Sequence, residues 1–244
     1  MTKLPDATAN YLFDTCGYVM HRAHFDEPTV RELREQLERV WPADASGGIR
    51  RIGSLLHEFA EGRRLADELA KTFRVENYLN HPFRLIESYG LRRSAGSFQG
   101  FHNGFGERLF SNPDVSRAMW RHHTYHDGKL YCMMVKVLVY LTDVVTLEDS
   151  PFCLVEGSHK ANFPFPLPHK WDGDIPDLAS VHAIYPKAGD VLVINEALMH
   201  GTYPKKSDGD RIVLAFSYSP SFVSDYVELP EEAPKDVLTT RFYS

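Results

Sequence analysis

The chain lacks the features that carry a protein into a membrane or onto nucleic acid. Its longest apolar runs, such as residues 137–141, are far shorter than the roughly 20 residues of a membrane-spanning helix. The first ten residues contain no apolar segment typical of a secretion signal, so we expect a soluble, cytoplasmic protein. Acidic residues outnumber basic ones by 33 to 27, with a pI near 6.0. This balance disfavours nucleic acid and anionic membranes as partners, and we expect a small-molecule ligand.

The chain has few cysteines, and they are far apart in the sequence. Cys16, Cys132 and Cys153 are odd in number and form no CxxC motif, which argues against a zinc knuckle or a disulfide framework. No internal repeat or low-complexity tract is present either. With 244 residues, of which 43% are hydrophobic, the chain is long enough for one domain with a sizeable core.

The hydrophobic pattern predicts helices first and strands afterwards. Residues 27–41 have the apolar spacing of one helical face, with Asp26 as N-cap and Pro28 in the first turn. A second helix is expected over residues 55–73. Strands are then expected at 83–89, 131–140, 152–155, 180–184, 191–194 and 212–218. This order predicts a single domain over 1–244 that is mainly β: N-terminal helices at about 27–73, a barrel at about 80–220 and a C-terminal tail at 221–244.

His200 and Arg211 frame the stretch that is most informative about chemistry. We expect a strand over residues 190–199, a turn rich in Pro, Asp and Gly at 204–210, and a returning strand that begins at Arg211. In such a hairpin both side chains can face one cavity. A neutral imidazole is a common metal ligand, and a guanidinium binds a carboxylate through two hydrogen bonds. A surface hairpin with a solvated Arg211 is the alternative.

A second histidine lies upstream in a glycine-containing stretch. His102 follows an apparent strand, and Gly104 lies two positions later on the same predicted face. Side chains at positions 102 and 104 would therefore be able to contact the same metal ion.

Three local runs and their order carry a resemblance to a known family. They are residues 137–144 (VLVYLTDV), residues 152–160 (FCLVEGSHK), and the stretch from Ala188-Gly189-Asp190 through His200-Gly201-Thr202 to Arg211. Over roughly residues 80–220 the chain resembles the phytanoyl-CoA dioxygenase family of iron(II)- and 2-oxoglutarate-dependent oxygenases. The opening run Phe13-Asp14-Thr15-Cys16-Gly17-Tyr18 is also similar to the family's start.

The resemblance implies a double-stranded β-helix barrel and a set of site residues. His102 and His200 would bind Fe(II), Arg211 would hold the far carboxylate of the cosubstrate 2-oxoglutarate, and Thr202 and Gln99 would assist it. The implied reaction uses O2 to hydroxylate a substrate C–H bond while 2-oxoglutarate is decarboxylated to succinate.

The chain departs from the family pattern at one ligand. The family has Asp two residues after the first histidine, whereas this chain has Gly104, so the set of two imidazoles and one carboxylate lacks its anion. Related iron halogenases carry Gly or Ala there and bind chloride instead, which makes halogenation a second hypothesis. Alternatively, Glu196, Glu107 or Asp127 supplies the carboxylate, water or substrate completes the coordination, or the metal site is degenerate.

Two other functional classes fit the sequence less well. A non-catalytic metabolite-binding barrel leaves Arg211 without a role, and a metal-dependent hydrolase or isomerase needs a water-activating carboxylate.

Residues 104–128 and 161–176 are expected to be substrate-binding loops. We expect the cluster of His122, His123 and His126 to be solvated or to face substrate. Lys136, in an apolar strand, is expected to extend its amine to solvent.

Overall fold

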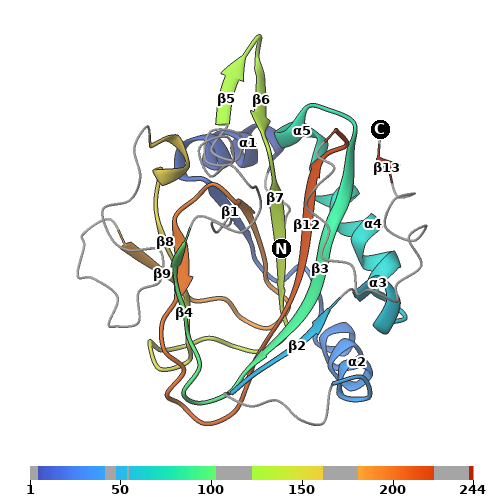
Figure 1. Cartoon of the computed structure of the whole chain (residues 1–244), viewed down its shortest axis with the longest axis vertical. Coiled ribbons are helices and arrows are strands. Elements are labelled where there is room, and N and C mark those ends of the chain that lie inside the picture. The colour runs from blue at the N-terminus through green and yellow to red at the C-terminus, as the bar shows by residue number, and fades with distance from the viewer. Residues whose placement is uncertain are drawn as a thin grey trace, which may run out of the picture.

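The computed structural model describes residues 5–41, 48–53, 55–102, 123–161 and 181–222, and the backbone of 242–243. Two antiparallel sheets face each other as the walls of a barrel (Figure 1). The larger sheet has the order β1 (Tyr18–His21), β10 (Val191–Asn195), β7 (Val135–Tyr140), β12 (Arg211–Pro220), β3 (Phe83–Arg93) and β13 (Phe242–Tyr243), with β2 (Ile49–Gly53) also paired to β3. The smaller sheet has the order β4 (Gln99–His102), β11 (His200–Thr202), β8 (Phe152–Val155) and β9 (Val181–Ile184). The expected mainly β double-stranded β-helix is confirmed.

Side-chain alternation in the larger sheet separates two hydrophobic layers. In β7, Val135, Val137 and Val139 pack outward with the helices, whereas Leu138 and Tyr140 pack inward against β8 of the smaller sheet. Because both faces of this central strand are covered, all six of its residues are buried. The inward face of the larger sheet therefore forms one wall of the barrel interior.

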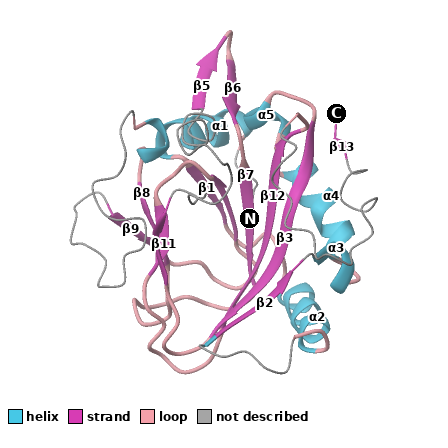
Figure 2. Ribbon diagram, in the orientation of Figure 1, coloured by secondary structure: helices cyan, strands magenta, loops and turns pink. Residues whose placement is uncertain are grey.

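Helices cover the outer face of the larger sheet (Figure 2). They are α1 (Asp6–Cys16), α2 (Glu27–Glu38), α3 (Leu55–Glu58), α4 (Gly62–Thr72) and α5 (Glu76–Leu79). In α2 the expected cap is confirmed, since the Asp26 carboxylate accepts a hydrogen bond from the Thr29 N–H at 2.9 Å. Among the described residues, no helix is long and apolar enough to cross a bilayer.

The helix expected over 55–73 is two helices. A Cβ atom at Gly62 would lie 2.1 Å from the carbonyl oxygen of Leu55, so the chain turns back closely on itself and only glycine fits there. The apolar residues of both pieces still pack into one core, which is why their spacing resembled one helix. Neither α1 nor α5 was expected from the sequence.

The hairpin expected around residues 200–211 is also wrong. The chain leaves the larger sheet after β10, enters the smaller sheet as β11, and returns to the larger sheet as β12. His200 and Arg211 thus lie on opposite walls of the barrel. The β5–β6 hairpin (His123–His126 and Lys129–Cys132) projects from one end (Figure 1).

Candidate functional site

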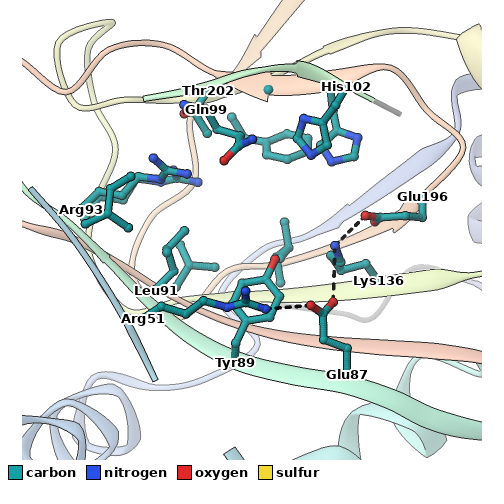
Figure 3. A pocket seen from close by; sticks show the side chains of 17 residues that line it. Arg51, Glu87, Tyr89, Leu91, Arg93, Gln99, His102, Lys136, Glu196 and Thr202 are labelled. Atoms are coloured by element: carbon teal, nitrogen blue, oxygen red, sulfur yellow. Dashed lines mark hydrogen bonds and ion pairs between the residues drawn. The ribbon is translucent and has the colours of Figure 1, made fainter. Parts of the chain in front are cut away.

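A cavity of about 310 Å³ lies between the two sheets. One side of it is formed by the smaller sheet and the other by β2, β3, β7 and β12 of the larger sheet (Figure 3). Its lining includes every site residue expected from the sequence that the structure describes: Gln99, His102, His200, Thr202 and Arg211. Strand alternation and one register shift bring these five side chains to the same cavity.

His102 and His200 are directly opposite each other on neighbouring strands. Their Cα atoms are register partners between β4 and β11, and the next pair is Thr202 with Gln99. The register shift between these pairs adds one residue to β4, which lets Gln99 and His102 face the same cavity although they are three residues apart. The two imidazole ring centroids lie 4.4 Å apart.

Both imidazoles are held in the tautomer that a metal requires. Nδ1 of His102 lies 2.8 Å from the Gly100 carbonyl oxygen, and Nδ1 of His200 lies 2.7 Å from that of Leu198. A carbonyl oxygen only accepts, so each Nδ1 carries the hydrogen and each Nε2 keeps its lone pair. Burial, with a smaller contribution from His200, lowers the pKa of His102 to about 3. Burial, with a smaller contribution from Lys136, lowers the pKa of His200 to about 3. Both rings are therefore neutral at neutral pH.

The spacing of the rings suits a single divalent ion. A metal–nitrogen bond of about 2.1 Å puts each ring centroid roughly 3.2 Å from the ion, so two ligands at a right angle have centroids about 4.5 Å apart. The observed 4.4 Å agrees with this. Phe152 stacks on His200 at 5.2 Å between ring centroids and further fixes the ring. The two histidines therefore fit a transition metal such as iron(II).

Arg211 enters the cavity from the opposite wall. It begins β12, is 4% exposed, and its guanidinium carbon lies 5.6 Å from the centre of the Tyr140 ring. Within the described part of the chain, its Nε and Nη1 have no hydrogen-bond partner. Buried donors of this kind are normally paired, so the site is built for an anionic ligand.

Thr202 and Gln99 lie beside each other at the rim of this region. The Thr202 hydroxyl accepts a hydrogen bond from the Gln99 backbone N–H at 2.9 Å. Its own hydrogen therefore remains available to donate to a ligand. The side chain of Gln99 lines the cavity while the residue is exposed.

A second cavity arginine was missed by the sequence analysis. Arg93 is the last residue of β3, and Glu87, Tyr89 and Leu91 precede it at alternate positions that also line the cavity. We expected this strand to end at residue 89. Had its alternation been continued to residue 93, Arg93 would have been placed on the inner face.

Lys136 does not extend to solvent, contrary to the sequence-based expectation. It lies on the inward face of β7, is 7% exposed, and its ammonium is 2.6 Å from Oε1 of Glu196 and 4.0 Å from Oε2 of Glu87. Arg51 on β2 pairs with the other oxygen of Glu87 at 2.8 Å. Figure 3 shows this chain of charges across the cavity from the histidines. Both faces of β7 are covered, so the amine had no route to solvent.

The candidate replacement carboxylates have different positions. Glu196 is 1% exposed and pairs with Lys136 through one oxygen, while its Oε2 has no partner among the described residues. Asp127 is on the exposed β5–β6 turn, pairs with His126, and does not line the cavity. Gly104 and Glu107 lie outside the described residues. Among those that are described, no group of three His, Cys, Asp or Glu side chains is placed to hold a metal.

Of the described members of the histidine cluster, only His126 is solvated as expected, and His123 is neither solvated nor part of the cavity lining. His126 is exposed, but the side chain of His123 is 2% exposed and lies 2.9 Å from both the Asp14 carboxylate and the Asn195 amide. Because Asn195 accepts from the Ala197 N–H through Oδ1, its Nδ2 donates to His123. His123 thus braces the turn that precedes His200. His122 lies outside the described residues, as do residues 104–122 and 162–176 of the two expected binding loops.

Comparisons with known proteins agree with this geometry. Residues 13–213 match the family model described as phytanoyl-CoA dioxygenase (PhyH). The structure of HygX from Streptomyces hygroscopicus with nickel and 2-oxoglutarate bound is similar, with 37% identity, coverage of 93% of this chain and 91% of HygX, and a TM-score of 0.77. HygX with nickel, 2-oxoglutarate and hygromycin B bound gives 36% identity, 93% and 92% coverage, and a TM-score of 0.76. The 2-oxoglutarate-dependent epimerase SnoN from nogalamycin biosynthesis shares the fold, at 16% identity, 94% and 91% coverage and a TM-score of 0.64. No curated protein sequence matches.

Proposed function

The chain belongs to the phytanoyl-CoA dioxygenase family of iron(II)- and 2-oxoglutarate-dependent oxygenases, and from this premise we propose that it hydroxylates a C–H bond of a small molecule. In this reaction 2-oxoglutarate is decarboxylated to succinate. One observation carries the proposal: two neutral imidazoles with free Nε2 atoms face the same cavity as a buried guanidinium that has no described partner.

Each site residue has a defined task in this reaction. His102 and His200 would hold iron(II) through Nε2, and the metal would supply the activation of O2 that the protein groups cannot provide. Arg211 binds the far carboxylate of 2-oxoglutarate, and the Thr202 hydroxyl donates to the same cosubstrate. No protein side chain needs to act as a general base.

The polar wall opposite the histidines is suited to a polar substrate. Glu87, Lys136 and Glu196 bring both charge signs to one surface, and Tyr89 offers an aromatic face between Arg51 and Lys136. HygX, whose structure contains hygromycin B, supports a small-molecule substrate for this chain as well. We therefore expect a substrate with several hydrogen-bonding groups, at least one of which contacts this wall.

Halogenation is the second candidate, and the charge of the cavity favours it. Among the described residues, four cationic side chains line the cavity, Arg51, Arg93, Lys136 and Arg211, together with two carboxylates, Glu87 and Glu196. A divalent metal adds two positive charges, and 2-oxoglutarate removes two. An excess of positive charge remains, and Gly104 supplies no anion where the family has Asp. Chloride would balance part of this charge as a metal ligand.

The proposed function is tested first by binding and then by turnover. Protein freed of metal is titrated with Ni(II) and 2-oxoglutarate in a calorimeter, and then incubated with Fe(II), O2 and a panel of polar metabolites while succinate is measured. We expect His102→Ala and His200→Ala to lose Ni(II) binding and succinate release. His182→Ala, an exposed histidine on β9, is the matched control. A wild-type protein that binds neither Ni(II) nor 2-oxoglutarate would contradict the proposed function.

Mass spectrometry separates the two reaction outcomes. The same incubation is run with and without chloride, and product masses are compared. A gain of one oxygen that is independent of chloride supports hydroxylation. A chloride-dependent gain of chlorine, absent in Gly104→Asp, supports halogenation and contradicts hydroxylation as the main reaction.

A further inference from the structure

Arg93 and Arg211 form a pair of buried cations at one end of the cavity. Their Cα atoms are register partners between β3 and β12, so both side chains leave the sheet side by side on the same face. Arg93 is 3% exposed and Arg211 4% exposed. Figure 3 shows the Arg93 guanidinium at the same end of the cavity as Gln99 and Thr202, on the facing wall.

Nothing described in the chain neutralises this pair. Nε and Nη1 of both arginines are buried without a hydrogen-bond partner among the described residues, and neither guanidinium forms an ion pair with a described carboxylate. The other two cations of the cavity differ in this respect, because Arg51 pairs with Glu87 and Lys136 pairs with Glu196. Burial, and then repulsion from Arg211, lowers the pKa of Arg93 to about 10. Two desolvated like charges with unmet donors are unfavourable unless an anion binds between them.

We propose that Arg93 and Arg211 together form one carboxylate-binding site, in which Arg93 is a second residue that holds the far carboxylate of 2-oxoglutarate. This inference rests on the proposed function. A carboxylate has two oxygens with about four acceptor positions, so it accepts paired N–H groups from two guanidiniums. All of these residues line the cavity, and Figure 3 shows Arg93 at the opposite end from the polar wall of Glu87, Lys136 and Glu196. A substrate contacting that wall leaves this end of the cavity to the cosubstrate.

The test measures binding to Ni(II)-loaded protein by calorimetry. Two ligands are compared: 2-oxoglutarate, and 2-oxobutyrate, which keeps the 2-oxo acid but lacks the far carboxylate. Arg93→Met is expected to bind 2-oxoglutarate about 10- to 100-fold more weakly, as for the loss of a charge-assisted hydrogen bond. Its affinity for 2-oxobutyrate is expected to stay unchanged. Arg93→Lys, which keeps the charge but loses the planar fork, is expected to lie between wild type and Arg93→Met.

Arg92→Gln is the matched control. Arg92 is the neighbouring residue, but its side chain pairs with Glu38 and Asp210 and does not line the cavity. We expect its affinity for 2-oxoglutarate to equal that of the wild type. Equal weakening in Arg92→Gln and Arg93→Met would overturn the proposal, because the effect would then come from disturbance of β3.

Thermal unfolding gives a readout that does not depend on turnover. Without ligand, Arg93→Met is expected to unfold at a higher temperature than the wild type, because it removes a buried, repelled cation. The rise in unfolding temperature caused by 2-oxoglutarate is expected to be smaller in the variant than in the wild type. A purely structural Arg93 would give the opposite first result, a lower unfolding temperature without ligand.

The outcomes distinguish this inference from the proposed function. The first outcome is that the wild type and Arg93→Met bind 2-oxoglutarate equally well, whereas Arg211→Met does not bind it. In that case Arg93 serves another anion, such as one on the substrate. This outcome overturns the inference about Arg93 but not the proposed function. If the wild type does not bind 2-oxoglutarate at all, both proposals fail.

Discussion

The ammonium of Lys136 lies 2.6 Å from Oε1 of Glu196, inside the cavity that holds the two histidines. This contact fixes one of the two carboxylate oxygens of Glu196. Oε1 of Glu196 is held by the buried lysine, so only Oε2, which has no partner among the described residues, is left for another contact. The pair therefore gives Glu196 a structural role on the cavity wall opposite the histidines.

Breaking this buried pair should be strongly destabilising. We expect Lys136→Met to lower the free energy of unfolding by about 3–5 kcal/mol, because the Glu196 carboxylate remains buried without its cation. The double variant Lys136→Met/Glu196→Leu replaces both charges by apolar groups and should recover most of the loss. Urea unfolding of the three proteins measures both effects. A loss below about 1 kcal/mol in Lys136→Met, typical of an exposed pair, would show that the amine reaches solvent.

Local patterns predicted the architecture better than the paths between strands. The periodicity of α2 and the apolar runs of β7 and β12 are properties of short segments, so the sequence was sufficient to find them, although the strand expected over 131–140 joined β6 to β7. The crossing of the chain from β10 through β11 to β12 depends on which sheet each strand joins, and that is set by distant packing. A hairpin was therefore expected where the chain changes sheets twice.

The same distinction applies to the site. His102, His200 and Arg211 were predicted because they match a family pattern, and the structure brings all three to one cavity. Arg93 belongs to no such pattern, and its inward position depends on the full length of β3. Lys136 is buried because other parts of the chain cover both faces of β7. The sequence of β7 alone does not predict this.

The Thr202 hydroxyl links the two strands that carry the histidines. It accepts a hydrogen bond from the Gln99 N–H at the register shift between β4 and β11. Thr202→Val leaves this N–H unpaired, so we expect a loss of about 1–3 kcal/mol in the free energy of unfolding and weaker binding of 2-oxoglutarate. Thr202→Ser keeps the hydroxyl and should retain both properties. If calorimetry and chemical unfolding give equal values for the Val and Ser variants, the hydrogen bond has no such role.

His159 should make stability depend on pH in the acidic range. Its Nε2–H donates to the Asp14 carbonyl at 2.9 Å, and Nδ1 is buried without a partner in the described chain. Burial, and then the neighbouring His123, lowers its pKa to about 4. The unfolded chain, with an ordinary histidine pKa near 6.5, binds more protons between these values. Stability from this group is therefore complete above about pH 6.5 and is lost as the pH falls towards 4, by at most about 1.4 kcal/mol per pH unit.

The variant His159→Gln removes this titration and keeps a donor for the Asp14 carbonyl. We expect its unfolding free energy to change less steeply than that of the wild type between pH 6.5 and 4. His182→Gln, at an exposed position on β9, serves as the control and should follow the wild type. Parallel pH curves for the wild type and His159→Gln would contradict the assignment.

Gly62 permits the sharp break between α3 and α4. A Cβ atom there would lie 2.1 Å from the Leu55 carbonyl oxygen, and backbone atoms cannot move aside cheaply. We expect Gly62→Ala to lose about 1–3 kcal/mol of stability through overpacking, although alanine favours helix more than glycine does. Gly53→Ala, where an added Cβ meets nothing within 4 Å, should be nearly neutral. Thermal and urea unfolding compare the two.

The missing carboxylate at Gly104 should make metal binding depend on chloride. If two imidazoles and an exchangeable anion hold the ion, Ni(II) affinity in the wild type should rise when an inert anion is replaced by chloride. Gly104→Asp supplies a permanent anionic ligand in the position that the family uses, so its Ni(II) affinity should be higher and independent of chloride. Gly104→Ala adds a side chain without charge and should behave like the wild type. Calorimetric titrations at constant ionic strength measure all three. Wild-type affinity that ignores chloride would instead indicate that a carboxylate from elsewhere in the chain, such as Glu107, completes the coordination.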